Sequence, residues 1–358
     1  MTRFIVTGAT GFIGRRLLEL LLEQGHSVTA MLHTSESDSG LDARVDSFRA
    51  DVTQPATLQG KFRQCDVVVH LAGCTIERAK HEFELVNHQG TLHVASECAS
   101  ESDPPRFLFV SSLAAAGPSK PGKPHVESDP AQPVSNYGKS KRDAEQALLK
   151  LSNRLPICIV RPPSVFGDTD PYLLSLFKAA KWGLVVMAGR GTHSYSYIHV
   201  DDLARVLLHL AECSSVQCHE CDPDPLMSDT ASRSNQPPRN SSNGNSLPDA
   251  RLVFAAHHPP LTFPQVADLV ADAVGTKRVR RIHIPGPFCW TLAWVNSVVG
   301  RLFRLRPLLN LDKMREGMAG SWACDSTFLT EDLRFEFPRP LESQIRETAK
   351  SYQAMGKM

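Results

Sequence analysis

The chain begins with a strand, a glycine-rich turn and a helix in immediate succession, and this order restricts the fold more than any other feature. Arg3–Thr7 is a short apolar run typical of a buried strand, and Ile13–Gln24 repeats its apolar residues at helical spacing. The connecting turn reads Thr7-Gly-Ala-Thr-Gly-Phe-Ile-Gly14. A turn of this kind that leads from a strand directly into a helix predicts a dinucleotide-binding fold.

Each glycine of the turn has its own physical reason. Gly8 permits the tight turn, Gly11 lets a pyrophosphate approach the backbone, and Gly14 lets the helix and the strand pack closely. The helix N-terminus then offers free N–H groups and a positive dipole to the anion. The cofactor contacts that we expect in this segment are Gly8, Thr10, Gly11, Phe12, Ile13 and Gly14.

Strands and helices continue to alternate through the first half of the chain. The expected strands are Ser27–Leu32, Ser47–Ala50, Asp66–Leu71, Phe107–Ser111 and Ile157–Arg161, and the expected helices are Glu84–Ser100 and Tyr137–Leu151. Such alternation implies right-handed crossovers, which place helices on both faces of a parallel sheet. The predicted fold class is α/β, a Rossmann doubly wound parallel sheet with a smaller, mostly helical C-terminal substrate lobe.

Two domains and one insertion follow from this pattern. We assign residues 1–166 to the dinucleotide-binding domain and 167–358 to the substrate lobe, interleaved with returning strands. Residues 214–248 are rich in Ser, Asn, Pro and Asp and have few large apolar side chains, so we predict a disordered insertion. A strand at Arg251–Ala256 and a helix at Pro264–Val274 follow it.

The charges of the chain are balanced, with 39 Lys and Arg against 38 Asp and Glu. This gives no electrostatic reason to expect nucleic acid or an anionic membrane as a partner. The apolar strand at the N-terminus leaves no room for a signal peptide, and the nine cysteines are mostly isolated, which favours a cytoplasmic protein with reduced thiols. We expect a small-molecule substrate and no metal; a homodimer is left open.

Two later features have competing interpretations. The stripe of Trp290, Trp294 and Val298 fits a core or a hydrophobic groove better than a membrane contact. Peripheral membrane association is kept as the alternative because three arginines follow, Arg301, Arg304 and Arg306. The pair Cys218 and Cys221 has no second pair of ligands nearby, which argues against zinc.

The second strong motif is Tyr137-Gly-Lys-Ser-Lys141. Residues four apart lie on one helix face, so the lysine ammonium is near the phenol. A phenol titrates near ~10, too high for a base at neutral pH, and a nearby cation lowers that value. We expect Tyr137 to move the proton, with Lys141 lowering its pKa, and both to contact the cofactor.

With these motifs, the sequence resembles the extended short-chain dehydrogenases/reductases, which include sugar-nucleotide epimerases, dehydratases, 3β-hydroxysteroid dehydrogenases and dihydroflavonol reductases. The resemblance covers nearly the whole chain except 214–248. Its further segments are Asp51-Val52, Leu71-Ala-Gly73, Val86-Asn87, Val110-Ser-Ser-Leu-Ala-Ala-Ala-Gly117, Arg161-Pro-Pro-Ser-Val-Phe-Gly167 and Tyr197-Ile-His-Val-Asp-Asp-Leu203.

The resemblance implies roles for individual residues. Ser112 takes the role of the catalytic serine, because of its spacing to Gly117. The implied cofactor contacts are Asp51, Val52, Leu71, Ala72, Gly73, Pro162 and Val165, and the implied substrate contacts are Ser112, Ser164 and Tyr195. For Ser111 and Ser112, Asn87, His199 and Asp201, a purely structural hydrogen-bonding role is the alternative.

The choice of dinucleotide depends on the end of the second strand. NAD enzymes often place an acid there to bind the ribose hydroxyls, but this strand ends in His33-Thr34-Ser35. These side chains can donate to a 2′-phosphate, which favours NADP over NAD, although His33 lacks the grip of an arginine. Glu36 and Asp38 follow closely and could instead bind the ribose of NAD.

The expected reaction is hydride transfer between a nicotinamide and a hydroxy or keto group of a small, fairly apolar substrate. Sugar-nucleotide epimerases and dehydratases, the first alternative, need a cation to hold a diphosphate, and the matching position here is Tyr195. A non-catalytic redox sensor is the second alternative. It is disfavoured because Ser112, Tyr137 and Lys141 are all present.

Overall fold

The computed structural model describes residues 1–35, 40–77, 79–168, 170–188, 192–213, 251–276, 279–284, 286–291, 295–296 and 311–358. The predicted insertion at 214–248 lies outside these ranges. So do Glu36, Asp38, Cys218, Cys221, Trp294, Val298, Arg301, Arg304 and Arg306. No helix among the described residues is both long and apolar enough to span a bilayer.

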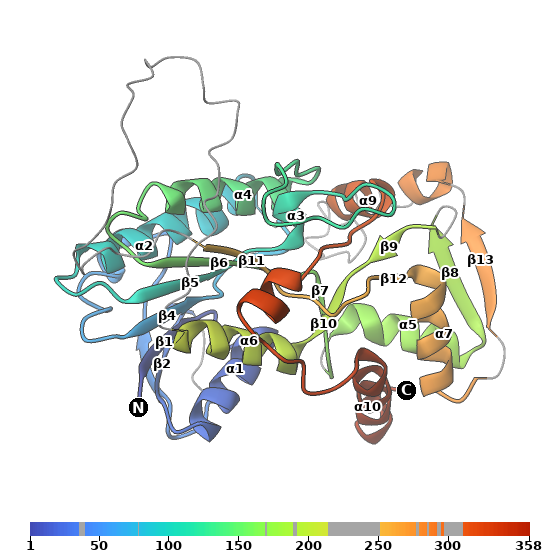
Figure 1. The fold of residues 1–358 in the computed structure, drawn as a ribbon, viewed down its shortest axis with the longest axis horizontal. Coiled ribbons are helices and arrows are strands. Elements are labelled where there is room, and N and C mark those ends of the chain that lie inside the picture. Colours follow the sequence, from blue (N-terminus) through green and yellow to red (C-terminus); the bar gives the residue numbers. More distant parts are fainter. Residues whose placement is uncertain are drawn as a thin grey trace, which may run out of the picture.

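A seven-stranded parallel sheet forms the centre of the larger lobe, in the order β3-β2-β1-β4-β5-β6-β11 (Figure 1). Its strands are β1 (Arg3–Thr7), β2 (Ser27–Leu32), β3 (Asp46–Arg49), β4 (Val67–His70), β5 (Arg106–Val110), β6 (Ile157–Arg161) and β11 (Arg251–Phe254). The order reverses between β1 and β4. Ligands of doubly wound sheets bind at the carboxyl ends of the strands on either side of such a reversal.

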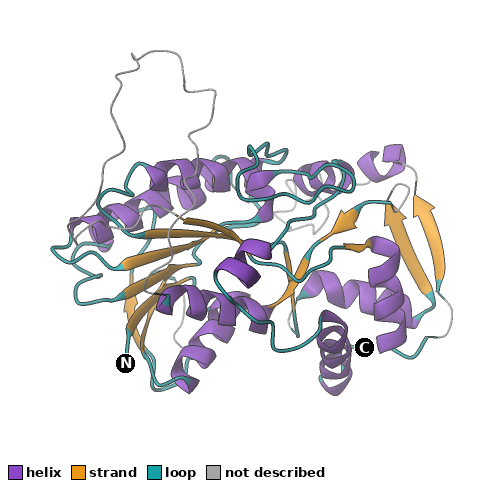
Figure 2. Cartoon of the chain, viewed as in Figure 1, coloured by secondary structure: helices purple, strands orange, loops and turns teal. Residues whose placement is uncertain are grey.

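Helices cover both faces of this sheet (Figure 2). One face carries α1 (Phe12–Glu23) and α6 (Val200–Glu212), and the other carries α2 (Gly90–Ser100) and α4 (Asn136–Leu149). Leucines at helical spacing form the contact between α1 and α6, namely Leu17, Leu20, Leu21, Leu203, Leu207 and Leu210. Burial of each such side chain contributes roughly 1.5–3 kcal/mol, which is why these helices form here.

The structure modifies two predicted elements. The helix predicted at Glu84–Ser100 starts as a π-helical segment, η2 (Phe83–Gln89), and becomes α-helical only in α2. The strand predicted at Arg251–Ala256 ends at Phe254 and joins the main sheet beside β6. The chain therefore returns to the first domain after residue 167, through both α6 and β11.

The smaller lobe has its own core between α5 (Pro171–Lys181), α7 (Phe263–Ala273) and α10 (Leu341–Ala354). The side chains that fill it include Phe177, Val266, Val270, Ile345 and Tyr352. Short strands pair around it: β8 (Leu184–Ala188) with β13 (Arg280–Ile284), β9 (Ser194–Tyr195) with β12 (Leu261–Thr262), and β7 (Ser164–Phe166) with β10 (Tyr197–His199).

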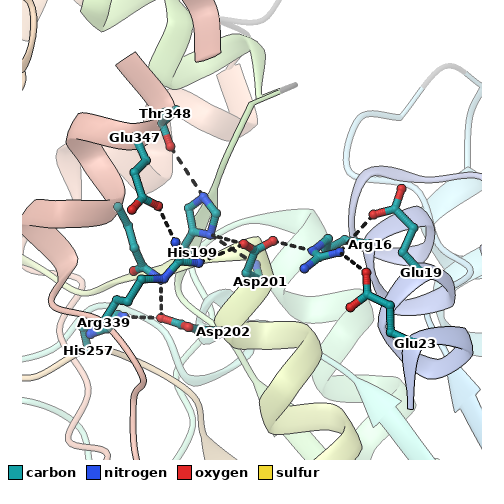
Figure 3. A network of polar contacts seen from close by, with 11 residues as sticks. Arg16, Glu19, Glu23, His199, Asp201, Asp202, His257, Arg339, Glu347 and Thr348 are labelled. Carbon is teal, nitrogen blue, oxygen red and sulfur yellow. Dashed lines mark hydrogen bonds and ion pairs between the residues drawn. The ribbon is translucent and has the colours of Figure 1, made fainter. Parts of the chain in front are cut away.

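A polar network at the start of α6 connects the two lobes (Figure 3). His199 caps this helix, with its Nδ1 accepting from the Asp201 backbone N–H at 3.2 Å. The Asp201 carboxylate lies between Arg16 of α1 and Arg339 just before α10. His199 and Asp201 thus have structural partners, in agreement with the structural alternative.

Candidate active site

The glycine turn forms a backbone cradle between β1 and α1. Gly8 has φ +66°, and a Cβ there would lie 2.7 Å from the Ala72 nitrogen. A Cβ on Gly14 would lie 2.3 Å from the Gly8 carbonyl oxygen. Gly11 precedes α1 and contributes no side-chain cap to its first turn. The turn therefore presents backbone N–H groups at a helix N-terminus, an arrangement that fits a pyrophosphate.

Of the segments expected around the cofactor, the turn after β4 lies directly beside this cradle. Leu71 and Ala72 run beside Gly8, and the Ala72 N–H donates to Thr7 Oγ1 at 3.1 Å. Gly73 faces Lys141, because a Cβ on it would lie 3.5 Å from Nζ. Pro162 accepts a hydrogen bond from the Leu113 N–H at 2.8 Å, and Val165 pairs with Ile198 in the strand pair β7–β10.

The segment expected to bind the adenine ribose is contacted by Arg49. His33 Nδ1 lies 2.7 Å from Ser35 Oγ, and its Nε2 lies 3.6 Å from Asp51 Oδ2. Arg49 donates from Nη1 to the His33 carbonyl at 3.4 Å. Arg15 donates to the Thr10 carbonyl at 2.9 Å and to the Gly40 carbonyl at 3.2 Å. Neither arginine belongs to the His33–Ser35 turn, so local sequence carries no signal for these contacts.

Asp51 and Val52 have well-defined partners. Asp51 accepts from the backbone N–H and the hydroxyl of Thr53, both at 2.8 Å. Burial raises the pKa of Asp51, but these hydrogen bonds and nearby His33 outweigh it, so the pKa lies below its ordinary value. Val52 packs against Gly90, where a Cβ would lie 2.7 Å from Val52 Cγ2.

Tyr137 and Ser112 meet at the carboxyl end of β5. Ser112 precedes the short helix α3 (Leu113–Ala116) and accepts from the Ala114 N–H at 3.1 Å, and its hydroxyl lowers the pKa of the Tyr137 phenol. Ser111 points elsewhere and donates to buried Glu145 at 2.6 Å. Of the two neighbouring serines, only Ser112 is therefore in a position to share a substrate oxygen with Tyr137.

Lys141 lies one turn further along α4 and is almost fully buried. Its ammonium donates to the Val110 carbonyl at 3.0 Å and lies 4.8 Å from the Phe109 ring centroid. Burial lowers the pKa of Lys141 from 10.5 to about 8, although Cys74 and Glu145 act in the opposite direction. The hydrogen bond to Val110 thus fixes the Lys141 ammonium beside Gly73.

Burial raises the pKa of Tyr137 above its ordinary value, and the ammonium of Lys313 is the strongest of the effects that lower it. The Tyr137–Lys141 spacing predicts this effect for Lys141, whereas in the structure Lys313 exerts it most strongly. Lys313 belongs to α9 (Leu311–Met318), and its ammonium lies 5.0 Å from the centroid of the Tyr137 ring. Sequence spacing gave no signal for this contact, since Lys313 is far from Tyr137 along the chain.

Apolar side chains surround the phenol. Tyr137 clusters with Phe83 and Ala114, and Cys74 and Trp322 pack against them. Tyr195 forms a β-bridge with Trp322, which places it at the edge of this cluster, and burial raises its phenol pKa.

Ser164 is exposed in β7. Asn87 bonds the backbone of Cys74, at 2.8 Å to its nitrogen and 2.9 Å to its oxygen, which fits a structural role.

The fold is that of a Rossmann protein, and its features are those of a dinucleotide-binding site. These features are the reversal of strand order, the glycine cradle, and the Ser112, Tyr137 and Lys141 side chains near the carboxyl ends of the strands. Residues 4–218 match the family described as "NAD dependent epimerase/dehydratase family", and the chain belongs to that family. This confirms the resemblance to the extended short-chain dehydrogenases/reductases and indicates a nicotinamide cofactor.

Individual proteins show the same relationship. A ceramide reductase from Caulobacter vibrioides is 32% identical over 204 residues, 57% of this chain and 59% of that protein. A 3beta-hydroxysteroid-dehydrogenase/decarboxylase, isoform 2, from Arabidopsis thaliana is 24% identical over 97% of this chain and 61% of its own length. This chain thus spans about three fifths of the length of both relatives.

Solved structures confirm the predicted fold class. The UDP-glucose 4-epimerase of Thermus thermophilus in complex with NAD superposes with a TM-score of 0.69 over 98% of this chain and 99% of that one. Sequence identity in that superposition is 20%, so the likeness concerns the fold alone.

Proposed function

We propose that this chain catalyses hydride transfer between a nicotinamide dinucleotide and a hydroxyl- or carbonyl-bearing carbon of a small, largely apolar substrate. The observation that carries this proposal is the burial of Tyr137 inside an apolar cluster, with Ser112 close enough to lower the pKa of its phenol and Lys141 buried one turn away. The bound cofactor supplies or accepts the hydride.

The side chains supply the proton and hold the oxygen. In the direction of reduction, the Tyr137 phenol donates its proton to the carbonyl oxygen as the carbon receives the hydride, and a phenolate remains. Ser112 donates a hydrogen bond to the same oxygen, where negative charge develops. Lys141, held by the Val110 carbonyl, orients the ribose hydroxyls of the cofactor and adds positive charge near the phenolate.

The surroundings of Tyr137 support an apolar substrate. Phe83, Ala114 and Trp322 offer carbon surface next to the phenol. The nearby cation, Lys313, is already paired with Glu316 at 2.8 Å, which leaves it poorly suited to hold a diphosphate. The names of the two relatives, a ceramide reductase and a hydroxysteroid dehydrogenase, point to the same chemical class.

The decisive experiment compares wild type with Tyr137→Phe. NADH and NADPH oxidation would be followed with a panel of apolar ketones and aldehydes, and epimerisation of UDP-glucose would be measured in parallel. We expect net oxidation of cofactor with an apolar carbonyl compound and a loss of roughly 10²–10⁴-fold in kcat for Tyr137→Phe, with unchanged cofactor affinity. Epimerisation without net cofactor consumption would replace this proposal by the sugar-nucleotide alternative.

We further propose that the enzyme prefers NADPH. His33 and Ser35 offer donors at the expected ribose position, and Arg49 brings permanent positive charge to the same segment. A 2′-phosphate requires such donors, whereas the hydroxyls of NAD require an acceptor. Titration of both reduced cofactors should show tighter NADPH binding in wild type, a reversal in His33→Asp and a loss of preference in Arg49→Ala. Tighter binding of NADH to wild type would exclude the assignment.

A further inference from the structure

Helix α9 packs against the first turn of α4 through its charged side chains. Asp312 accepts from the backbone N–H of Asn136 at 2.7 Å and from that of Tyr137 at 3.1 Å. Glu316 accepts from the Ser135 hydroxyl at 2.7 Å. An anion at a helix N-terminus is stabilised by the free N–H groups and by the helix dipole. A distant segment of the chain therefore holds the backbone of Tyr137 in place.

The same helix carries a cation over the Tyr137 ring. Lys313 Nζ lies 5.0 Å from the ring centroid and 2.8 Å from Glu316 Oε2. The Lys313 side chain is 25% exposed and that of Glu316 is 16% exposed, so both charges are largely shielded from water. In such surroundings, charge interactions are stronger than at an open surface.

We propose that Lys313 is a positioning residue that stabilises the phenolate of Tyr137 through the face of its ring, with Asp312 and Glu316 holding it there. This rests on the proposed function, in which Tyr137 cycles between phenol and phenolate. An ammonium over an aromatic face is attracted to the neutral ring and more strongly to the anionic one. The catalytic tyrosine is thus supported by a cation from α9, near the C-terminal end of the chain, in addition to Lys141.

The charges around Tyr137 shift the pKa of its phenol in opposite directions, so each variant has a predicted direction of shift. The groups that act on its phenol are Cys74 after β4, Ser112 after β5, and Lys313 and Glu316 on α9; Asp312 contacts its backbone N–H, and Lys141, on its own helix, donates to the Val110 carbonyl. Burial raises the phenol pKa, Lys313 and Ser112 lower it, and Glu316 and Cys74 raise it. A glutamine at position 316 can still accept a hydrogen bond from Lys313, so Glu316→Gln removes the charge without releasing Lys313. Lys313→Met and Glu316→Gln must therefore shift the pKa of the Tyr137 phenol in opposite directions.

The test is a direct titration of Tyr137. Tyrosinate absorbance would be recorded against pH for each variant in the full-length protein, and the corresponding Tyr137→Phe double variant would be subtracted to remove the other four of the five tyrosines. We expect Lys313→Met to raise the phenol pKa by about 1 unit and Glu316→Gln to lower it. Lys313→Arg should restore the wild-type value. Lys139→Met, which removes an exposed charge from α4, the helix that carries Tyr137, should leave the phenol pKa unchanged.

The pH profile of kcat/KM gives a second readout. The apparent pKa in it that reports the Tyr137 phenol should shift in the same direction as the absorbance titration. An unchanged phenol titration in Lys313→Met, or the same shift in Lys139→Met, would overturn the inference. If Lys313→Met does not fold, the direction of the shift in Glu316→Gln decides. Activity retained in Tyr137→Phe would refute the proposed function instead, and the absorbance titration would still report on Lys313.

Discussion

Arg161 and Glu145 form a bidentate ion pair in the interior, with Nε–Oε1 and Nη2–Oε2 distances of 2.9 and 2.6 Å. Their side chains are 2% and 0% exposed. Arg161 ends β6, and Glu145 lies one turn beyond Lys141 on α4. The pair therefore fixes the helix that carries Tyr137 and Lys141 against the edge of the sheet. Ser111 completes the arrangement by donating to Glu145 Oε1 at 2.6 Å.

We expect Glu145→Gln to lower the free energy of unfolding by about 3–5 kcal/mol, because it leaves the Arg161 charge buried without its counter-ion. Denaturant titration of both proteins measures this loss. Asp66→Asn is the control, since Asp66 pairs with Arg3 at the surface and the change should cost about 1 kcal/mol or less. Equal losses in the two variants would contradict the structural role given to the Arg161–Glu145 pair.

Replacement of Lys141 by Met should separate activity from stability. Burial lowers the pKa of Lys141 to about 8 in the folded protein, so between pH 8 and its unfolded value of 10.5 only the unfolded chain keeps the proton. Wild-type stability must then rise with pH across this window, by about 1.4 kcal/mol per pH unit at most. Lys141→Met should lack this rise while losing turnover. A constant difference in Tm between the two proteins from pH 7 to 10.5 would disprove it.

Two neighbouring aspartates at the start of α6 should differ sharply in their contribution to stability. Asp202 is fully buried and accepts from His257 and Gln344, both at 2.7 Å, whereas Asp201 is partly exposed (Figure 3). Asp202→Ala leaves two buried donors unpaired and should cost about 3 kcal/mol or more. Asp201→Ala should cost about 1 kcal/mol, as expected for partly solvated ion pairs. Thermal unfolding of both variants at neutral pH compares them, and a reversed order would contradict this reading.

Replacement of Ser112 should mainly affect catalysis, whereas replacement of Ser111 should mainly affect stability. Ser112→Ala removes the hydroxyl that lowers the pKa of the Tyr137 phenol and that we propose holds the substrate oxygen, so we expect kcat to fall by about 10²–10³-fold. Ser111→Ala removes a donor to Glu145, so its main effect should be a loss of stability, with kcat within about tenfold of wild type. Steady-state kinetics and thermal unfolding on the same preparations test both. A larger kinetic effect of Ser111→Ala would move the catalytic role to that residue.

Local patterns were sufficient to predict most elements of the sheet. Ser27–Leu32 and Ile157–Arg161 form strands with the predicted bounds, because their apolar runs and flanking residues are local properties of the sequence. The helix predicted at Tyr137–Leu151 runs from Asn136 to Leu149, a small shift that reflects how helix ends depend on caps. The π-helical start of η2 was not predicted, since apolar spacing does not distinguish it from an α-helix.

The sequence alone determined the Rossmann class, the cradle at Gly8, Gly11 and Gly14, and the candidate roles of Ser112, Tyr137 and Lys141. The cradle and the Tyr137–Lys141 pair depend on residue type and on spacing within one turn or one helix, and the role of Ser112 follows from the resemblance to a known family. Only the tertiary structure brought Arg49 to His33, and Asp312 and Lys313 to Tyr137, across a separation of 175 residues between Tyr137 and Asp312. Such contacts arise when separately formed elements pack together, and the local sequence carries no periodicity or spacing that encodes them.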